Sequence, residues 1–242
     1  MKLKILALVC IFALSLGGPA SAIFFTSTSA TLPTSGTDDS AVGTVAWSNP
    51  GNITASDNTY ALFSSSVSGS VSHYLKGLTF GFAIPAGATI NGITMVNARK
   101  GNFSQIGKDC KDNTLSLVKA GVVESTNKAD TSTRWPTTEA DATYGSASDL
   151  WSSTWTASDI NNANFGVVLS AKLTTDGTQD CSVDNFTITV TYTAAAGNPG
   201  AGFFMISHAG LREIMDKLFD PARSVQTYTQ TRSARAIAAS GH

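Results

Sequence analysis

Charged side chains are scarce in this 242-residue sequence: they make up 14% of it, and the only glutamates are Glu124, Glu139 and Glu213. Ser, Thr, Gly and Asn fill most of the polar positions instead. Few helix-favouring charges together with many Thr, Val and Ile are typical of β proteins with many turns. The formal net charge of −1 is not that of a basic nucleic-acid-binding protein, so we expect no nucleic-acid partner.

The side chains that hydrolytic enzymes need are scarce too. Glycoside hydrolysis uses two carboxylates that flank the scissile bond, yet the central region has only Glu124 and Glu139, and its aspartates stand mostly among turn residues. Nucleophilic hydrolysis uses a serine with a histidine and an acid. His73 is the only histidine between residues 23 and 198, and no serine lies in a Gly-x-Ser-x-Gly motif. We therefore expect a protein without enzymatic activity.

The first 22 residues have the layout of a secretory signal peptide. Lys2 and Lys4 precede an apolar stretch over 5–16, residues 17–19 break it, and Ala20-Ser21-Ala22 provides small residues for cleavage. The apolar stretch is shorter than the roughly 20 residues of a membrane span. The sequence thus predicts a mature chain that begins at Ile23, has no transmembrane segment, and is secreted, periplasmic or at the cell surface.

Cysteine is rare, with three in the chain, and Cys10 lies inside the predicted signal peptide. Cys110 and Cys181 remain, an even number that tends to pair in an oxidising compartment. We therefore predict a Cys110–Cys181 disulfide, with two separate buried thiols as the alternative. Two cysteines without nearby histidines do not make a zinc site.

Short runs of alternating apolar and polar residues, separated by turn residues, dominate the rest of the chain. In 183–193, Phe186, Ile188, Val190 and Tyr192 alternate with threonines, which predicts an apolar face and a threonine face toward solvent. No helix separates these runs, which excludes a parallel α/β fold. The sequence predicts an all-β, antiparallel two-sheet β-sandwich of the jelly-roll kind. The predicted strands are 41–47, 59–67, 72–84, 89–99, 114–119, 122–125, 165–173 and 183–193.

The chain is expected to have five parts: a signal peptide (1–22), an N-terminal extended segment (23–41), the sandwich (42–193), a linker (194–202), and an amphipathic helix with a basic tail (203–242). Apolar residues of the predicted helix 208–220 follow the i, i+3, i+4, i+7, i+8 rule, and Pro221 ends it ahead of a disordered stretch. The helix either docks on its own sandwich or on a partner, which would be a membrane surface or another subunit of a homo-oligomer. Its apolar stripe consists of Leu211, Ile214, Met215, Leu218 and Phe219.

Several motifs resemble a jelly-roll-like β-sandwich domain of poorly characterised phage and bacterial surface proteins. They include Trp47-Ser48-Asn49-Pro50, the run from Phe80 to Ile93, the segment Asp149-Leu150-Trp151 and the run from Val183 to Tyr192. The resemblance covers about residues 45–193 and implies a β-sandwich fold but no particular activity. The signal peptide departs from phage proteins, which assemble in the cytoplasm, and so favours an exported, cellular member.

A long irregular insert at 126–163 concentrates aromatic residues, namely Trp135, Tyr144, Trp151 and Trp155. Flat aromatic faces on loops are what sugar-binding sandwiches use, so these four are the candidate ligand-binding residues. The alternative is a satellite core that fixes the insert to the sandwich. Within the insert, Thr156 or Ser158 is placed to cap a single helical turn.

A calcium ion is the only cofactor that the sequence suggests. Asp176, Asp180 and Asp184 supply carboxylate oxygens within one short stretch, and oxygen-rich loops bind Ca²⁺ outside cells. The alternative is an ordinary turn, because Asp176-Gly177 is a strong hairpin signal.

Together these features predict an exported, non-enzymatic β-sandwich module that binds or adheres at the cell surface, with a glycan or a protein as its ligand. The alternative is a structural subunit of a virion or extracellular assembly, with the C-terminal helix making the subunit contacts.

Overall fold

The computed structural model describes residues 26–102, 109–174, 176–177 and 179–195. The chain divides into two compact units, residues 1–198 and 199–242, and all described residues belong to the first. The signal peptide and the tail helix with its apolar stripe therefore lie outside the described residues.

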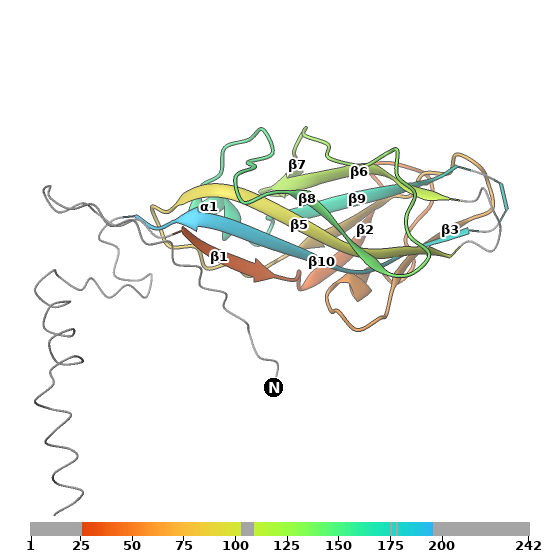
Figure 1. The fold of residues 1–242 in the computed structure, drawn as a ribbon, viewed down its shortest axis with the longest axis horizontal. Coiled ribbons are helices and arrows are strands. Elements are labelled where there is room, and N and C mark those ends of the chain that lie inside the picture. Colours follow the sequence, from red (N-terminus) through yellow and green to blue (C-terminus); the bar gives the residue numbers. More distant parts are fainter. Residues whose placement is uncertain (1–25, 103–108, 175, 178, 196–242) are drawn as a thin grey trace, which may run out of the picture. The chain divides into compact units, whose positions relative to one another are not determined.

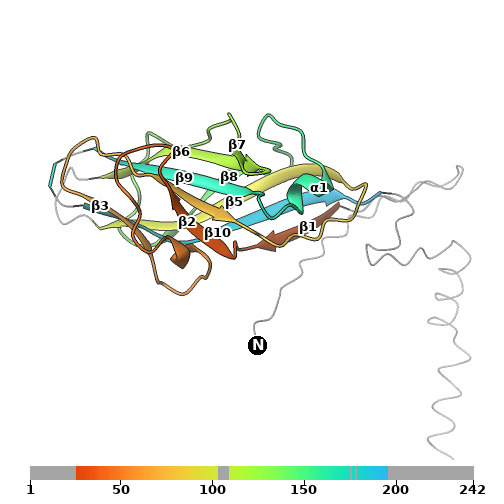
Figure 2. The ribbon, with the colours of Figure 1, turned by 180° about the vertical axis from the view of Figure 1, so that it is seen from behind.

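Two antiparallel five-stranded sheets form the two layers of a β-sandwich, which confirms the predicted fold class (Figures 1 and 2). The first sheet contains β1 (Thr26–Thr31), β3 (Ala61–Ser65), β5 (Thr89–Asn102), β8 (Ala140–Gly145) and β10 (Gln179–Thr193). The second contains β2 (Ser35–Asp39), β4 (Tyr74–Leu78), β6 (Cys110–Lys119), β7 (Val122–Val123) and β9 (Gly166–Leu173). Two short helices, η1 (Pro50–Ile53) and α1 (Ala157–Ile160), complete the described elements.

The strand order is that of a jelly roll. The first sheet runs β3-β10-β5-β8 and the second β4-β9-β6-β7. If β3 is counted as the first strand, the first sheet contains strands one, eight, three and six in that order. The second sheet contains strands two, seven, four and five, and two interlocked Greek keys have this arrangement. β1 and β2 are additions at the edges: β1 pairs with β10 beyond the end of β3, and β2 pairs with β4.

The core lies between the sheets because each strand turns alternate side chains inward. β5 and β10 are the longest strands and pair along nearly their whole length, with register shifts at Val183/Asn185 and Thr191/Tyr192. Phe186, Ile188 and Val190 of β10 are fully buried, as their alternation predicts. The threonines between them are not open to solvent as predicted, since Thr187 and Thr189 are half-buried and Thr191 is 5% exposed.

Two predicted strands differ from the structure. Over 41–47 the only ladder contact is an isolated bridge from Val45 to Ser72. The predicted strand 72–84 is a strand only as β4, and the chain then leaves the extended conformation at Thr79 and Gly81, which have positive φ. At its end, the Asn161 side chain accepts a hydrogen bond from Ile84 N and donates one to Ile84 O, each at 2.8 Å. The sequence reading also missed β1, β2 and β8, which are polar and lack a clear alternation.

One end of the sandwich is closed by α1 and a cluster of rings. Thr156 caps α1 as predicted: its hydroxyl accepts from Asp159 N, and the Asp159 carboxylate accepts from Thr156 N. Ile160 is buried, while Phe165 meets Trp155 edge-on at 5.4 Å and Phe82 at 5.8 Å between ring centroids. These contacts join the long insert to the core.

Candidate functional site

A polar groove lies on the outer face of the first sheet, where β3, β10 and β5 run side by side. In β10, Cys181 points into the core, so its neighbours Asp180 and Ser182 point outward. Ser182 pairs with Leu62 of β3 on one side and with Lys100 of β5 on the other. Three adjacent strands therefore form the floor of the groove.

The long insert supplies the wall. Gly101 N in β5 donates a hydrogen bond of 2.8 Å to Pro136 O, which holds Thr137 beside Lys100. The space so enclosed has a volume of about 370 Å³. We call it the β10 groove; its lining consists of Leu62, Lys100, Gly101, Thr137, Asp180 and Ser182.

The two charged side chains of the β10 groove make no ion pair with any residue that the structure describes. Lys100 Nζ lies 3.8 Å from the centroid of the Tyr60 ring, a cation–π contact that steadies the ammonium group and leaves its N–H donors unused. The Asp180 carboxylate accepts no hydrogen bond from the described residues. The lining of the groove thus includes one donor group and one acceptor group that form no ion pair with the described residues.

The predicted disulfide lies directly beneath the groove. Cys110 of β6 and Cys181 of β10 are bonded with their Cα atoms 6.0 Å apart, and both are fully buried. The bond crosses the core from one sheet to the other. Because Cys181 stands between Asp180 and Ser182, the disulfide fixes the strand segment that forms the groove floor.

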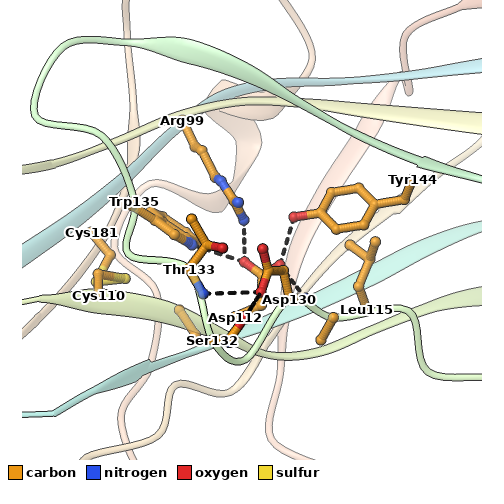
Figure 3. Close-up of polar contacts among 12 residues, drawn as sticks. Arg99, Cys110, Asp112, Leu115, Asp130, Ser132, Thr133, Trp135, Tyr144 and Cys181 are labelled. Carbon is orange, nitrogen blue, oxygen red and sulfur yellow. Dashed lines mark hydrogen bonds and ion pairs between the residues drawn. A yellow bond between two sulfur atoms is a disulfide. The ribbon is translucent and has the colours of Figure 1, made fainter.

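A buried polar cluster anchors the wall. The carboxylate of Asp112 in β6 accepts hydrogen bonds from Arg99 Nη1, from Trp135 Nε1 at 2.8 Å and from the Tyr144 hydroxyl at 2.5 Å. It also accepts from Asp130 N at 3.0 Å. Figure 3 shows these side chains pointing toward Asp112 with the disulfide close by. Arg99 and Tyr144 come from the first sheet, so the cluster joins both sheets to the insert.

Two pKa shifts fit this architecture. Burial raises the pKa of the Tyr144 hydroxyl far above its ordinary value, and the charge of Asp112 raises it further, so Tyr144 remains a hydrogen-bond donor. Hydrogen bonds from Ser132 and Thr133 hold the pKa of Asp130 far below its ordinary value. Asp130 therefore stays ionised and keeps the turn that presents its backbone N–H to Asp112.

The four aromatic residues predicted to bind a ligand have buried side chains. Trp135 and Trp151 are each 1% exposed, Trp155 is 7% and Tyr144 8%. Their polar atoms are also occupied, since Trp151 Nε1 donates to Ile93 O at 2.8 Å and Trp155 Nε1 to Leu150 O at 3.0 Å. A sugar platform requires open ring faces, so their burial favours the alternative in which they fix the insert to the sandwich.

The three aspartates predicted as calcium ligands are not gathered into a metal site. Asp176 accepts from Ser68 N at 2.9 Å, Asp184 is buried and accepts from Asn185 Nδ2 at 2.8 Å, and Asp180 faces the β10 groove. Among the residues placed by the structure, no three His, Cys, Asp or Glu side chains lie close enough to hold a metal ion.

The described part of the chain contains no helix with the length and apolarity that crossing a bilayer demands.

The sequence reading missed the β10 groove. In the sequence, Lys100 directly follows a predicted strand and Asp180 belongs to a predicted turn, so nothing indicates that they line one groove. A signal exists in the outward position of Asp180 and Ser182 on either side of Cys181, but it is visible only once the register with β5 is known.

No protein-family model and no curated protein matches the chain. Among solved structures, a chain described as "Cyanophage Pam1 capsid asymmetric unit" is 16% identical, with a TM-score of 0.29. The match covers 75% of this chain and 94% of that chain. At that TM-score the likeness supports no functional argument, so the resemblance to phage and bacterial surface proteins stays a prediction.

Proposed function

We propose that the protein is an exported, non-enzymatic binding module that holds a carbohydrate in the β10 groove. The observation that carries this proposal is that two charges, Lys100 and Asp180, make no ion pair with any described residue and line a groove whose floor is fixed from below by the Cys110–Cys181 disulfide. Binding sites work best when the first contacts are held rigidly by the elements beneath them.

The lining suits a ligand rich in hydroxyl groups. Lys100 can only donate hydrogen bonds and Asp180 can only accept them, while the hydroxyls of Thr137 and Ser182 do both. One sugar hydroxyl can accept from Lys100 and donate to Asp180 at the same time. Leu62 adds an apolar contact for the C–H face of a sugar ring.

Export is part of this proposal. The disulfide is a cross-link that persists in oxidising compartments such as the periplasm or the extracellular space. This agrees with the predicted signal peptide and with a ligand outside the cell.

The test is binding of the mature protein to an immobilised array of neutral, amino and acidic oligosaccharides, followed by titration of any sugar retained. Lys100→Gln and Asp180→Asn each remove one charge-assisted hydrogen bond, which contributes about 1.5–3 kcal/mol. We expect each variant to bind the retained sugar about ten- to a hundredfold more weakly.

Lys172→Gln and Asp141→Asn are matched controls, because both residues are exposed and lie outside the groove. They should bind like the native protein, and thermal melting should show all four variants folded. If no sugar is retained, or if groove and control variants bind equally well, the carbohydrate proposal fails. Such a result would favour the alternative of a structural subunit. That alternative is tested by measuring self-assembly of the protein instead of ligand binding.

A further inference from the structure

One edge of β10 is a strong template for strand pairing. Residues 188–193 read Ile-Thr-Val-Thr-Tyr-Thr, all of them β-branched or aromatic and none charged. β5 covers one side of this segment, whereas β3 pairs only with residues 179–183 on the other side. A segment of this composition with an open edge recruits other strands. In the structure β1 covers it, with Thr26 opposite Thr193 and Thr31 opposite Ile188.

β1 is held there mainly by its backbone. Its sequence, Thr-Ser-Thr-Ser-Ala-Thr, offers no large apolar side chain to the core. Of the side chains that are described, Ser29 and Thr31 are half-buried and Ala30 is exposed. β10 is the only strand with which it pairs among the described elements. Any β1 strand that reaches this edge makes the same hydrogen bonds, whichever chain it comes from.

The connection after β1 is built like an exchange hinge. Three residues, Leu32 to Thr34, carry the chain from β1 in one sheet to β2 in the other. Pro33 is buried close to Gly77 of β4, so the body of the sandwich fixes the point at which β1 departs. A proline holds the residue before it extended, and short, stiff hinges favour exchange of the element they carry.

From these features we propose that β1 is an exchangeable arm and that its partner is a second copy of this chain. Two copies pair by placing their β1 strands on each other's β10 edges. Every backbone hydrogen bond between β1 and β10 is kept, and no new surface is needed.

Mixed chains that each carry one added cysteine test this directly. Ala30 lies opposite Thr189 at the outer face, within the distance that a disulfide spans. Ala30→Cys and Thr189→Cys proteins, each produced as the mature chain from Ile23 so that Cys10 is absent, are mixed at high concentration, oxidised mildly and separated without reductant. A cross-linked heterodimer, identified by intact mass, forms only when the arm of one chain lies on β10 of the other. The native cysteines are buried and bonded, so they do not compete.

The matched control is Val96→Cys mixed with Thr143→Cys, an outward pair in β5 and β8, which lie inside the chain and have no free end to exchange. We expect several-fold more heterodimer from the arm pair than from this control. Equal yields would overturn the proposal. A single chain that carries both Ala30→Cys and Thr189→Cys should close its own disulfide when dilute, and failure to do so would overturn the register on which the proposal rests.

Discussion

At the scale of single residues, Asp112 shows how a charge is kept inside this sandwich. Its side chain is fully buried, and four donors surround it, two from the first sheet and two from the insert. Removing a charge from water is unfavourable unless its partners replace the lost hydration. Arg99 depends on Asp112 in turn, because its side chain is 6% exposed and has no other ion-pair partner among the described residues.

Replacing Asp112 with alanine should therefore lower the free energy of unfolding by about 3–5 kcal/mol, since it leaves the Arg99 charge buried and unpaired. Urea denaturation of the oxidised protein measures this difference. Asp141→Ala is the control, because that side chain is exposed and its loss should change stability by less than about 0.5 kcal/mol. Similar midpoints for the two variants would show that the cluster contributes little.

At the residue scale, the sequence correctly predicted the disulfide, whereas for the tryptophans it left two alternatives open, of which their burial favours the packing role. Two cysteines in an exported chain leave one pairing, whatever the fold. The sequence of a polar insert does not show whether a tryptophan ring covers a core or faces a ligand. In the structure the burial of the rings and the hydrogen bond from Trp151 Nε1 to Ile93 O favour the first. The sequence does not predict the burial of Asp112, because its hydrogen-bond partners are not adjacent to it in the chain.

At the scale of elements, the chain from Thr79 to Ile84 has the alternating side-chain burial of a strand but not its backbone pairing. Phe80, Phe82 and Ile84 are buried and alternate with exposed residues, so the side-chain pattern is that of a strand. No ladder forms because the positive φ of Thr79 and Gly81 interrupts the extended backbone, and Asn161 instead of a neighbouring strand bonds the backbone N–H and C=O of Ile84. The alternation of apolar and polar residues in a sequence predicts which side chains are buried. It does not predict whether the backbone pairs with a neighbouring strand. The same reason explains why the polar strands β1, β2 and β8 were missed.

We expect Asn161→Ala to destabilise the fold by about 1–3 kcal/mol, because it leaves both backbone polar groups of a buried residue without their partner. Hydrogen exchange at the Ile84 amide should accelerate as well. Asn164→Ala, an exposed neighbour, serves as the control. An unchanged exchange rate at Ile84 would mean that this segment is held by its apolar side chains alone.

At the scale of the whole molecule, β10 is the last strand of the sandwich that the structure describes. The last ladder contact pairs Thr193 with Thr26 and Thr89, and within the described residues Val190 is the last buried core residue, with Tyr192 packed against the core. The prediction that Leu211, Ile214, Met215, Leu218 and Phe219 form a partner-docking stripe lies outside the described residues and stays a prediction.

A chain that ends at residue 198 should accordingly keep the melting temperature of the full-length protein within a few degrees. If the tail helix contacts a partner subunit, the same truncation should lower the concentration-dependent mass seen by light scattering. A large fall in melting temperature would show instead that the helix is part of the core.

The bond between Cys110 and Cys181 also limits how far the molecule can be stretched. The two residues are 71 positions apart in the chain. At about 3.4 Å per extended residue, the closed loop withholds about 240 Å of contour length from any force applied at the two ends. When the oxidised protein is pulled from its two ends, the residues within this loop therefore cannot extend. Reduction of the disulfide would let them extend under the same force.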